Sequence, residues 1–184
     1  MKHIILFLFI FVTIALSGET FSQDKPVQKK FLNLTTSETM VDIDQRIKDE
    51  WRELGFYYDL EESDYKNDWK FYGSKPGLQN FIKLIEDYTN KLDNDFLSEH
   101  DHYGPYRYLK IMTWNKAIIT ENYIAGTIKD LKNLKNIITD NLEKTQVGES
   151  FTIDKEYGED NTATAAFFIM ENNFDPVSMD KNYS

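Results

Sequence analysis

The sequence contains no cysteine. Disulfide bonds therefore cannot stabilise the folded chain, and no cysteine is present to carry a lipid. The chain must fold on its hydrophobic core alone. The Gly-x-Ser-x-Gly motif is also missing, and no serine has a convincing histidine partner for nucleophilic catalysis. We therefore predict a protein that is not an enzyme, with no catalytic residue and no cofactor.

Basic residues are in deficit. The chain of 184 residues has 21 Lys and Arg against 31 Asp and Glu, which gives a formal net charge of −10. Nucleic-acid binding calls for a basic surface, so this composition argues against a nucleic-acid partner. An acidic chain suits a basic protein partner, although solubility alone would also account for the charge.

Histidine is scarce, with three residues in the whole chain: His3, His100 and His102. On an extended strand, His100 and His102 would point the same way. Zinc sites need three or four ligands, so a carboxylate such as Glu99 or Asp101 would have to complete one. We predict no metal site here. A small metal-dependent hydrolase that uses His100 and His102 is the alternative enzymatic interpretation.

Long apolar runs are missing except near the start, where Ile4 to Leu16 is interrupted only by Thr13. A short basic start precedes this run and a polar stretch follows it, which is typical of a secretory signal peptide. We predict this signal over residues 1–22. The run is shorter than the roughly 20 residues of a membrane-spanning helix, which disfavours the alternative of an uncleaved anchor. The mature protein would be periplasmic or secreted, with no stable membrane insertion after cleavage.

After the signal, residues 23–50 are predicted to form a tether or a short helix, with helical apolar spacing between Met40 and Trp51. Residues 51–184 have the length of a single domain. Strand patterns cover residues 54–60, 68–73, 106–114, 117–125, 150–154 and 162–170, and helix patterns cover residues 74–92 and 126–144. These elements predict a two-layer α+β domain, in which an antiparallel sheet of about six strands carries two helices on one face.

The two predicted helices begin alike. The same chain distance separates Gly73 from Gly126 and Ser74 from Thr127, and each helix follows a pair of predicted strands. This spacing favours a duplicated ββα unit followed by a terminal hairpin. The alternative is that any glycine-capped amphipathic helix after a strand would match in this way.

Aromatic residues alternate in the predicted strand 106–114. By the period of two, Tyr106, Tyr108, Met112 and Trp114 would share one face, while Leu109 and Ile111 would face the helices. An apolar and aromatic face exposed to water usually marks a binding surface. Alternatively, the N-terminal segment or the C-terminal tail covers this face.

Two stretches resemble a known family. "WKFYGSKPGLQNFIKLIEDY", residues 69–88, is followed by "HDHYGPYRYLKIMTW", residues 100–114. Together they resemble small immunity proteins of bacterial polymorphic-toxin systems: a strand, a helix with a Gly-Leu start, an acidic spacer, a histidine segment and a strand. The resemblance implies a non-enzymatic α+β protein that binds and neutralises one cognate toxin. Many such proteins act in the cytosol, so the predicted signal here would place the toxin in the periplasm or envelope.

We therefore predict an exported binding protein whose probable partner is a cognate toxin. Its predicted partner-binding residues are His100, His102, Tyr103, Tyr106, Tyr108, Met112 and Trp114. The alternative is a periplasmic glycan-binding module, because exposed tyrosine and tryptophan rings stack on sugars and carboxylates bind their hydroxyls.

Overall fold

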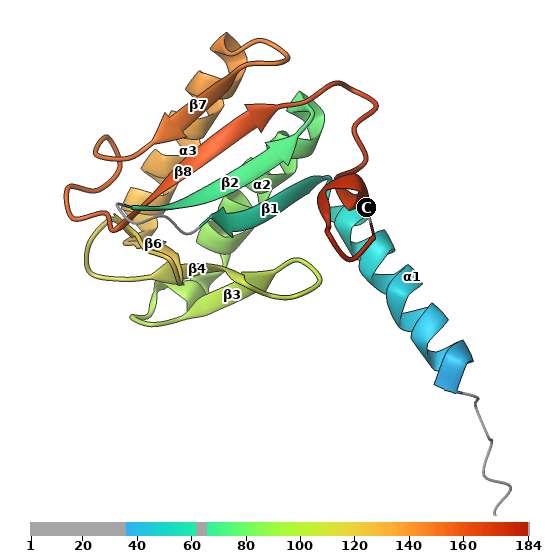
Figure 1. Ribbon diagram of the computed structural model, residues 1–184. Helices are drawn as coiled ribbons and strands as arrows, with labels where there is room; N and C mark the ends of the chain where they lie inside the picture. Colours follow the sequence, from blue (N-terminus) through green and yellow to red (C-terminus); the bar gives the residue numbers. More distant parts are fainter. Residues whose placement is uncertain (1–35, 62–65, 184) are drawn as a thin grey trace, which may run out of the picture. The chain divides into compact units, whose positions relative to one another are not determined.

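The computed structural model describes residues 36–61 and 66–183 (Figure 1). The predicted signal peptide and residues 23–35 of the predicted tether lie outside these ranges. The helices within them are α1 (Thr36–Leu54), α2 (Lys75–Asn90) and α3 (Ile128–Lys144), with short 3-10 helices η1 (Leu92–Asp95) and η2 (Pro176–Met179). The strands are β1 (Phe56–Glu61), β2 (Asn67–Gly73), β3 (His100–Tyr103), β4 (Leu109–Thr113), β5 (Ile118–Ile119), β6 (Ile124–Gly126), β7 (Ser150–Ile153) and β8 (Ala163–Ile169).

The α+β class is confirmed, but the prediction of one six-stranded antiparallel sheet is wrong. The described strands form two four-stranded mixed sheets, sheet A in the order β1-β2-β8-β7 and sheet B in the order β3-β4-β6-β5. In each sheet the central pair, β2 with β8 or β4 with β6, is parallel and the outer pairs are antiparallel. Hairpin signals do not reveal parallel pairs. In sheet A the pair joins distant segments, with Asn67 opposite Ala163, and in sheet B the short strand β5 comes between β4 and β6 in the chain.

A two-fold repeat is present, but its units differ from the predicted ones. The predicted strand 117–125 is two short strands, β5 and β6, which form the hairpin before α3, and the predicted strand 106–114 belongs to the first unit as β4 and does not form a hairpin with 117–125. Gly73 and Gly126 end β2 and β6, and the N-caps Ser74 and Thr127 have almost the same backbone angles, φ −61° and ψ 161° against φ −63° and ψ 162°. A hairpin follows each helix, β3–β4 after α2 and β7–β8 after α3. Each half of the domain is therefore a ββαββ unit. The first hairpin of each unit pairs with the second hairpin of the other unit, so neither half can complete a sheet alone.

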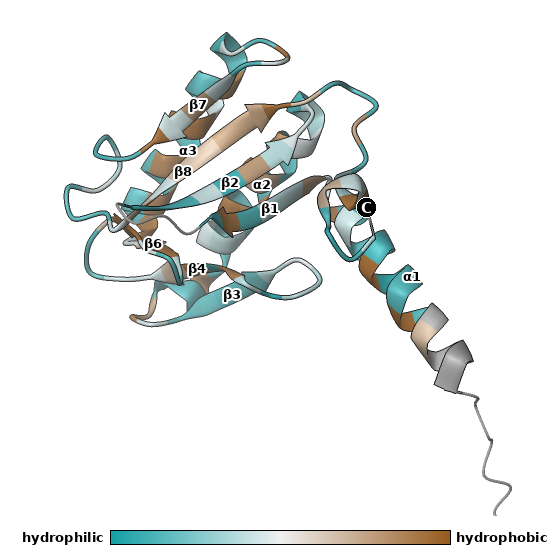
Figure 2. Ribbon diagram, viewed as in Figure 1, coloured by the Kyte–Doolittle hydropathy of each residue, from teal (hydrophilic) through white to brown (hydrophobic). Residues whose placement is uncertain are grey.

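One apolar core holds inward-facing residues of both sheets together with α2 and α3. The ring of Phe167 lies near its centre, stacked on Phe71 at 4.7 Å and on Phe151 at 4.9 Å between centroids. Figure 2 shows β8 as more apolar than β2 beside it. Leu109 and Ile111 are fully buried, as predicted.

Aromatic side chains with polar tips join the two sheets. Trp69 of β2 donates its Nε1–H to the carbonyl oxygen of Thr120 at 2.7 Å, next to β5. The hydroxyl of Tyr58 in β1 donates to the carbonyl oxygen of Tyr103 at 2.5 Å and accepts the amide of Leu109 at 3.3 Å. These bonds satisfy buried polar groups and set the position of sheet B against sheet A.

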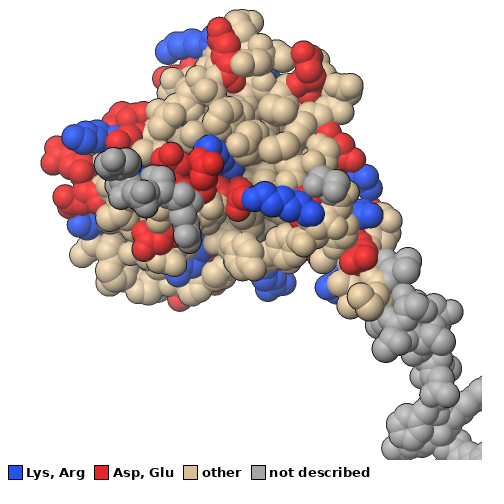
Figure 3. All heavy atoms as spheres, viewed as in Figure 1, with Lys and Arg blue, Asp and Glu red and all other residues tan. Residues whose placement is uncertain are grey.

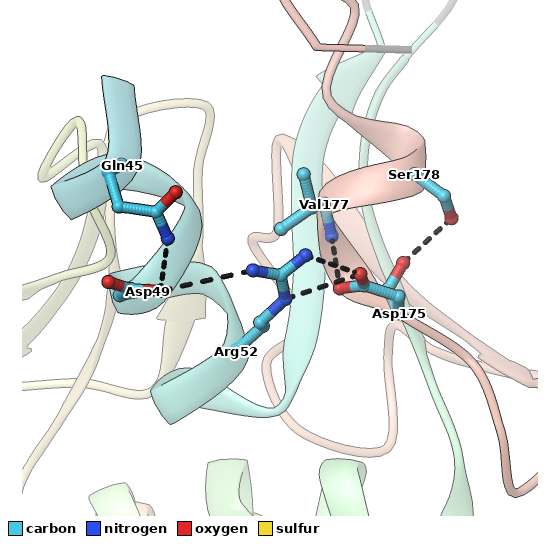
Figure 4. Close-up of polar contacts among 6 residues, drawn as sticks. All are labelled: Gln45, Asp49, Arg52, Asp175, Val177 and Ser178. Carbon is cyan, nitrogen blue, oxygen red and sulfur yellow. Dashed lines mark hydrogen bonds and ion pairs between the residues drawn. The ribbon is translucent and has the colours of Figure 1, made fainter. Parts of the chain in front are cut away.

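The C-terminal segment packs against α1. Arg52 of α1 contacts Asp175 with a 2.9 Å distance from Nη2 to Oδ2, and Asp175 also accepts the amide of Val177 as the N-cap of η2 (Figure 4). The hydrogen bond and charge of Arg52 lower the pKa of Asp175. Deeper in the contact, Trp51 donates its Nε1–H to Oδ2 of the buried Asp180 at 2.8 Å. Among the described helices, none combines the length and apolar character that crossing a membrane requires.

Candidate functional site

The two predicted histidines lie side by side on the outward side of β3. Their cross-strand neighbours on β4 are Met112 for His100 and Lys110 for His102, and the two imidazole centroids are 5.2 Å apart. Both side chains are exposed. The Nδ1 atom of His100 is 2.9 Å from the carbonyl oxygen of Ser98, and that of His102 is 2.8 Å from the carbonyl oxygen of Arg107. A carbonyl oxygen only accepts, so Nδ1 donates in both rings and Nε2 is the free acceptor of the neutral form.

Met112 and Trp114 share this outward side of sheet B, but they form a small cluster rather than an open face. Met112, Ile118 and Ala125 are buried, and the half-buried rings of Trp114 and Tyr123 pack against them. The sequence reasoning missed Tyr123, whose ring lies 5.3 Å from Nζ of Lys110. Tyr123 lies immediately before β6, inside the predicted strand 117–125. An aromatic residue in a strand predicted to lie next to 106–114 was the available signal.

The prediction that Tyr106 and Tyr108 share this face is wrong. Strand β4 begins at Leu109, and the preceding turn contains Gly104 at φ 78° and Arg107 at φ 56°, so the alternation does not extend back to Tyr106. Tyr106 is half-buried and donates its hydroxyl to Oδ2 of Asp180 at 2.8 Å.

Tyr103 and Tyr108 also lie away from the outward side of sheet B. Tyr103 pairs with the buried Leu109 and packs against the main core. Tyr108 is 70% exposed and lines a cavity of about 300 Å³ with Tyr58 and Trp69. The rings of Tyr106 and Tyr108 stack on each other at 5.8 Å between centroids. The predicted site residues therefore occupy more than one place, and the outward side of β3 with Met112 and Trp114 is one of them.

Three strongly exposed apolar side chains lie close together in the chain, just before β3. Leu92 is 89% exposed, Phe96 68% and Leu97 60%. Sequence reasoning treated this stretch as an acidic spacer and missed them. No clear signal was present in the sequence, because Leu92 and Phe96 are four residues apart, as on the apolar face of a helix.

Buried polar groups hold this loop in place. The Tyr88 hydroxyl donates to the carbonyl oxygen of Glu99 at 2.7 Å and lies 3.0 Å from Oγ1 of Thr113. Thr113 Oγ1 donates to the carbonyl oxygen of Asn94, and Asn94 Nδ2 donates to the carbonyl oxygen of Tyr88 at 3.0 Å. Burial raises the pKa of Tyr88, so its hydroxyl stays protonated at neutral pH. The loop therefore presents its apolar side chains from a fixed backbone.

We expect Tyr88→Phe to loosen this loop. Losing the hydroxyl removes one of the two donors to the carbonyl oxygen of Glu99, which keeps the amide of Thr113 at 2.9 Å, so the free energy of unfolding should fall by about 0.5–1.5 kcal/mol. Hydrogen exchange measured by mass spectrometry should be faster at the amides of residues 92–99. Tyr108→Phe is the matched control, because its exposed side chain should change neither quantity. Equal exchange in both variants would show that the network does not hold the loop.

Carboxylates surround the exposed apolar residues. Asp93, Asp95 and Glu99 are exposed, and none of them forms an ion pair with another described residue. Lys91 is paired with Asp101, with 2.7 Å from Nζ to Oδ2. We call loop 92–99 together with His100 and His102 the β3 surface. It carries three exposed apolar side chains and three exposed carboxylates within eight residues of the chain.

Comparisons of the chain with protein-family models, with curated proteins and with solved structures found no match. Within residues 36–61 and 66–183, no group of three or more His, Cys, Asp or Glu side chains is arranged to hold a metal ion. Because no known protein guides the interpretation, we infer the ligand of the β3 surface from the exposed side chains and charges of that surface. Exposed Leu and Phe side chains on a fixed loop can enter an apolar depression of another molecule.

Proposed function

We propose that this protein is a non-enzymatic binding protein that holds a protein partner on the β3 surface. The observation that carries the proposal is the exposure of Leu92, Phe96 and Leu97 on a loop held by buried hydrogen bonds. Moving one such side chain from water into an apolar pocket contributes roughly 1.5–3 kcal/mol. Apolar patches of this kind, rimmed by polar groups, mark interaction sites in soluble proteins.

The charge of the β3 surface indicates the kind of partner. The carboxylates of Asp93, Asp95 and Glu99, which form no ion pair within the described part of the chain, would be stabilised by lysine or arginine side chains around the partner's apolar depression. The net charge of −10 would also speed association with a basic protein. His100 and His102 extend the surface along β3, with Nε2 of each ring able to accept a hydrogen bond.

We further propose that the partner is a toxin that the protein neutralises. The resemblance of residues 69–88 and 100–114 to immunity proteins supports this class of partner, and the β3 surface lies between and within those stretches. An immunity protein acts by covering its toxin, which requires a rigid complementary surface and no catalytic group. With the predicted signal peptide, the encounter would take place in the periplasm or envelope.

A capture experiment tests the proposal. Residues 23–184 would serve as bait on an envelope fraction, with captured proteins identified by mass spectrometry. We expect one basic protein in a stoichiometric amount. The bait Leu92→Ser/Phe96→Ser/Leu97→Ser should lose it, because the variant removes the exposed apolar side chains without touching the core.

The control bait is Val147→Ser, which changes an exposed apolar residue between α3 and β7. It should capture the same protein as the unchanged chain. If the triple variant still captures that protein in the same amount, the β3 surface is not its binding site.

A further inference from the structure

Strand β3 is one edge of sheet B. Its neighbour on one side is β4, and no described strand pairs with its other side. Figure 1 shows β3 at the margin of the domain. The free side of an edge strand presents main-chain N–H and C=O groups that can pair with a strand of another molecule. Because β3 carries His100 and His102, this free edge is continuous with the β3 surface.

The hydrogen bonds next to β3 show which of its main-chain groups are free. Thr113, at the end of β4, donates its amide to the carbonyl oxygen of Glu99 at 2.9 Å. In an antiparallel pair, residues that exchange hydrogen bonds with the neighbouring strand alternate with residues that do not. Asp101 lies two residues after Glu99 and therefore bonds to β4. The N–H and C=O groups of His100 and His102 point away from β4, to the free edge.

These four main-chain groups are available to a partner. None of them is hydrogen-bonded to another residue in the described part of the chain, and both histidines are exposed. The backbone that leads into β3 is fixed. Ser98 has φ 74° and donates its amide to the carbonyl oxygen of Thr113 at 2.9 Å, so Ser98 and Glu99 form a β-bulge opposite Thr113. The edge is therefore held in its extended conformation before any partner binds.

A cavity of about 530 Å³ adjoins this edge, and His102 lines it from β3. The rest of its wall includes four charged side chains of both signs: Glu53 of α1, Lys83 and Asp87 of α2, and Arg107 of the turn after β3. None of these four side chains forms an ion pair within the described part of the chain. A long polar side chain that projects from a strand added to β3 can enter this cavity and bind a charged group of either sign.

Strand β3 itself has few features that would repel an added strand. Edge strands are often protected by lysine or proline, and the four residues of β3 include neither. Their one acidic side chain, Asp101, is paired with Lys91, with 2.7 Å from Nζ to Oδ2. Figure 3 shows mostly uncharged side chains along the lower margin of the domain, where Figure 1 places β3. An extended segment of another protein can therefore approach this edge.

From this geometry we propose that the partner of the β3 surface adds an extended segment to the free edge of β3, as a further strand of sheet B. The inference rests on the proposed function and specifies how the partner is held. The segment would bond to the free main-chain groups of His100 and His102. The apolar side chains of loop 92–99 would contact the partner beside it. Main-chain bonds supply affinity with any sequence, so these apolar side chains and the cavity would provide the selectivity.

Two substitutions at one position separate the main chain from the side chain. His102→Ala removes the imidazole and keeps the N–H, whereas His102→Pro removes both. The pairing of β3 with β4 should survive in His102→Pro, because the His102 amide does not bond to β4 and edge strands tolerate proline at such positions. The probe is the protein captured from the envelope fraction by residues 23–184, after purification. We expect His102→Pro to bind this probe about tenfold or more weakly than His102→Ala does, while the two variants have equal far-UV circular dichroism.

Amide hydrogen exchange, measured by NMR on the ¹⁵N-labelled protein, is the second measurement. In the free protein, the amides of His100 and His102 should exchange faster than the amide of Asp101, which is bonded to β4. Addition of the purified probe should slow the exchange at His100 and His102 at least about tenfold, because the added strand would bond to these N–H groups.

Three results would refute the added strand: slow exchange at His100 and His102 in the free protein, unchanged exchange at these amides in the complex, or equal affinity of His102→Pro and His102→Ala. The last two results would leave the proposed function intact, because the partner is still bound. If the unchanged chain captures no protein, the proposed function fails and the added strand fails with it.

Discussion

Replacing Phe167 with alanine should lower the free energy of unfolding by about 3–5 kcal/mol. The Phe167 ring is fully buried, stacks on Phe71 and Phe151, and lies 5.7 Å from the ring of Phe81. Its removal would leave a cavity among aromatic rings of sheet A and α2, which are too rigid to collapse into it. Equilibrium unfolding in urea, followed by circular dichroism, measures the loss.

The next residue along β8 is the matched control. Phe168 points to the outward face, is half-buried, and stacks on Tyr72. Phe168→Ala should cost only about 1–2 kcal/mol, from the lost ring pair and the smaller buried area. Equal losses for the two variants would mean that the register of β8, and with it the assignment of the two faces of sheet A, is wrong.

The second large effect is expected at Asp180. This carboxylate is 2% exposed and accepts hydrogen bonds from Nε1 of Trp51 and from the Tyr106 hydroxyl, both at 2.8 Å, and from the amide of Asn182 at 3.0 Å. Asp180→Ala would leave the buried Nε1–H of Trp51 and the half-buried hydroxyl of Tyr106 without this acceptor, so the free energy of unfolding should fall by about 2–4 kcal/mol. Trp51→Phe combined with Asp180→Ala should cost less than the sum of the single changes, because the two residues share one bond.

This contact also makes stability depend on pH. Burial alone would raise the pKa of Asp180, but the hydrogen bonds from Asn182, Trp51 and Tyr106 outweigh it and the pKa is lowered. The pKa of Asp175 is lowered mainly by its hydrogen bond to Arg52. Groups with a lowered folded-state pKa stabilise the protein above their ordinary pKa of about 3.9, and this stability is lost as the pH falls through the folded-state values.

Unfolding measured at pH 7 and again near pH 3 would show the effect. The unchanged protein should lose stability between these conditions. Asp180→Asn, which cannot titrate, should start less stable at pH 7 and lose less on acidification. If both proteins lose the same free energy of unfolding between pH 7 and pH 3, Asp180 does not contribute to the acid sensitivity.

Local features of the fold were predictable from the sequence. The helix patterns over residues 74–92 and 126–144 correspond to α2 and α3, and their N-caps are Ser74 and Thr127, the pair that stood at the repeat distance in the sequence. The pairing of β1 with β2 and of β7 with β8 was predictable as well. Helix caps, amphipathic spacing and hairpins depend on residues that are close in the chain, so the sequence shows them directly.

The candidate site was predictable only in part. The common side of His100 and His102 follows from the strand period, and the register places Met112 beside them. The turn at Arg107 and the burial of Tyr106 did not follow, because the partner of Tyr106, Asp180, lies 74 residues further along the chain. Leu92, Phe96 and Leu97 could be recognised as exposed only after Tyr88, Asn94 and Thr113 were seen to hold the loop.

The sequence by itself determined the charge, the lack of disulfides, the two capped helices and the duplicated strand–helix start. Only the tertiary structure decided that the hairpins exchange between the two halves, so that β2 lies beside β8 and β4 beside β6. The physical reason is distance along the chain. A parallel strand pair and a buried carboxylate shared by Trp51 and Tyr106 each depend on residues that meet only when the whole domain has folded.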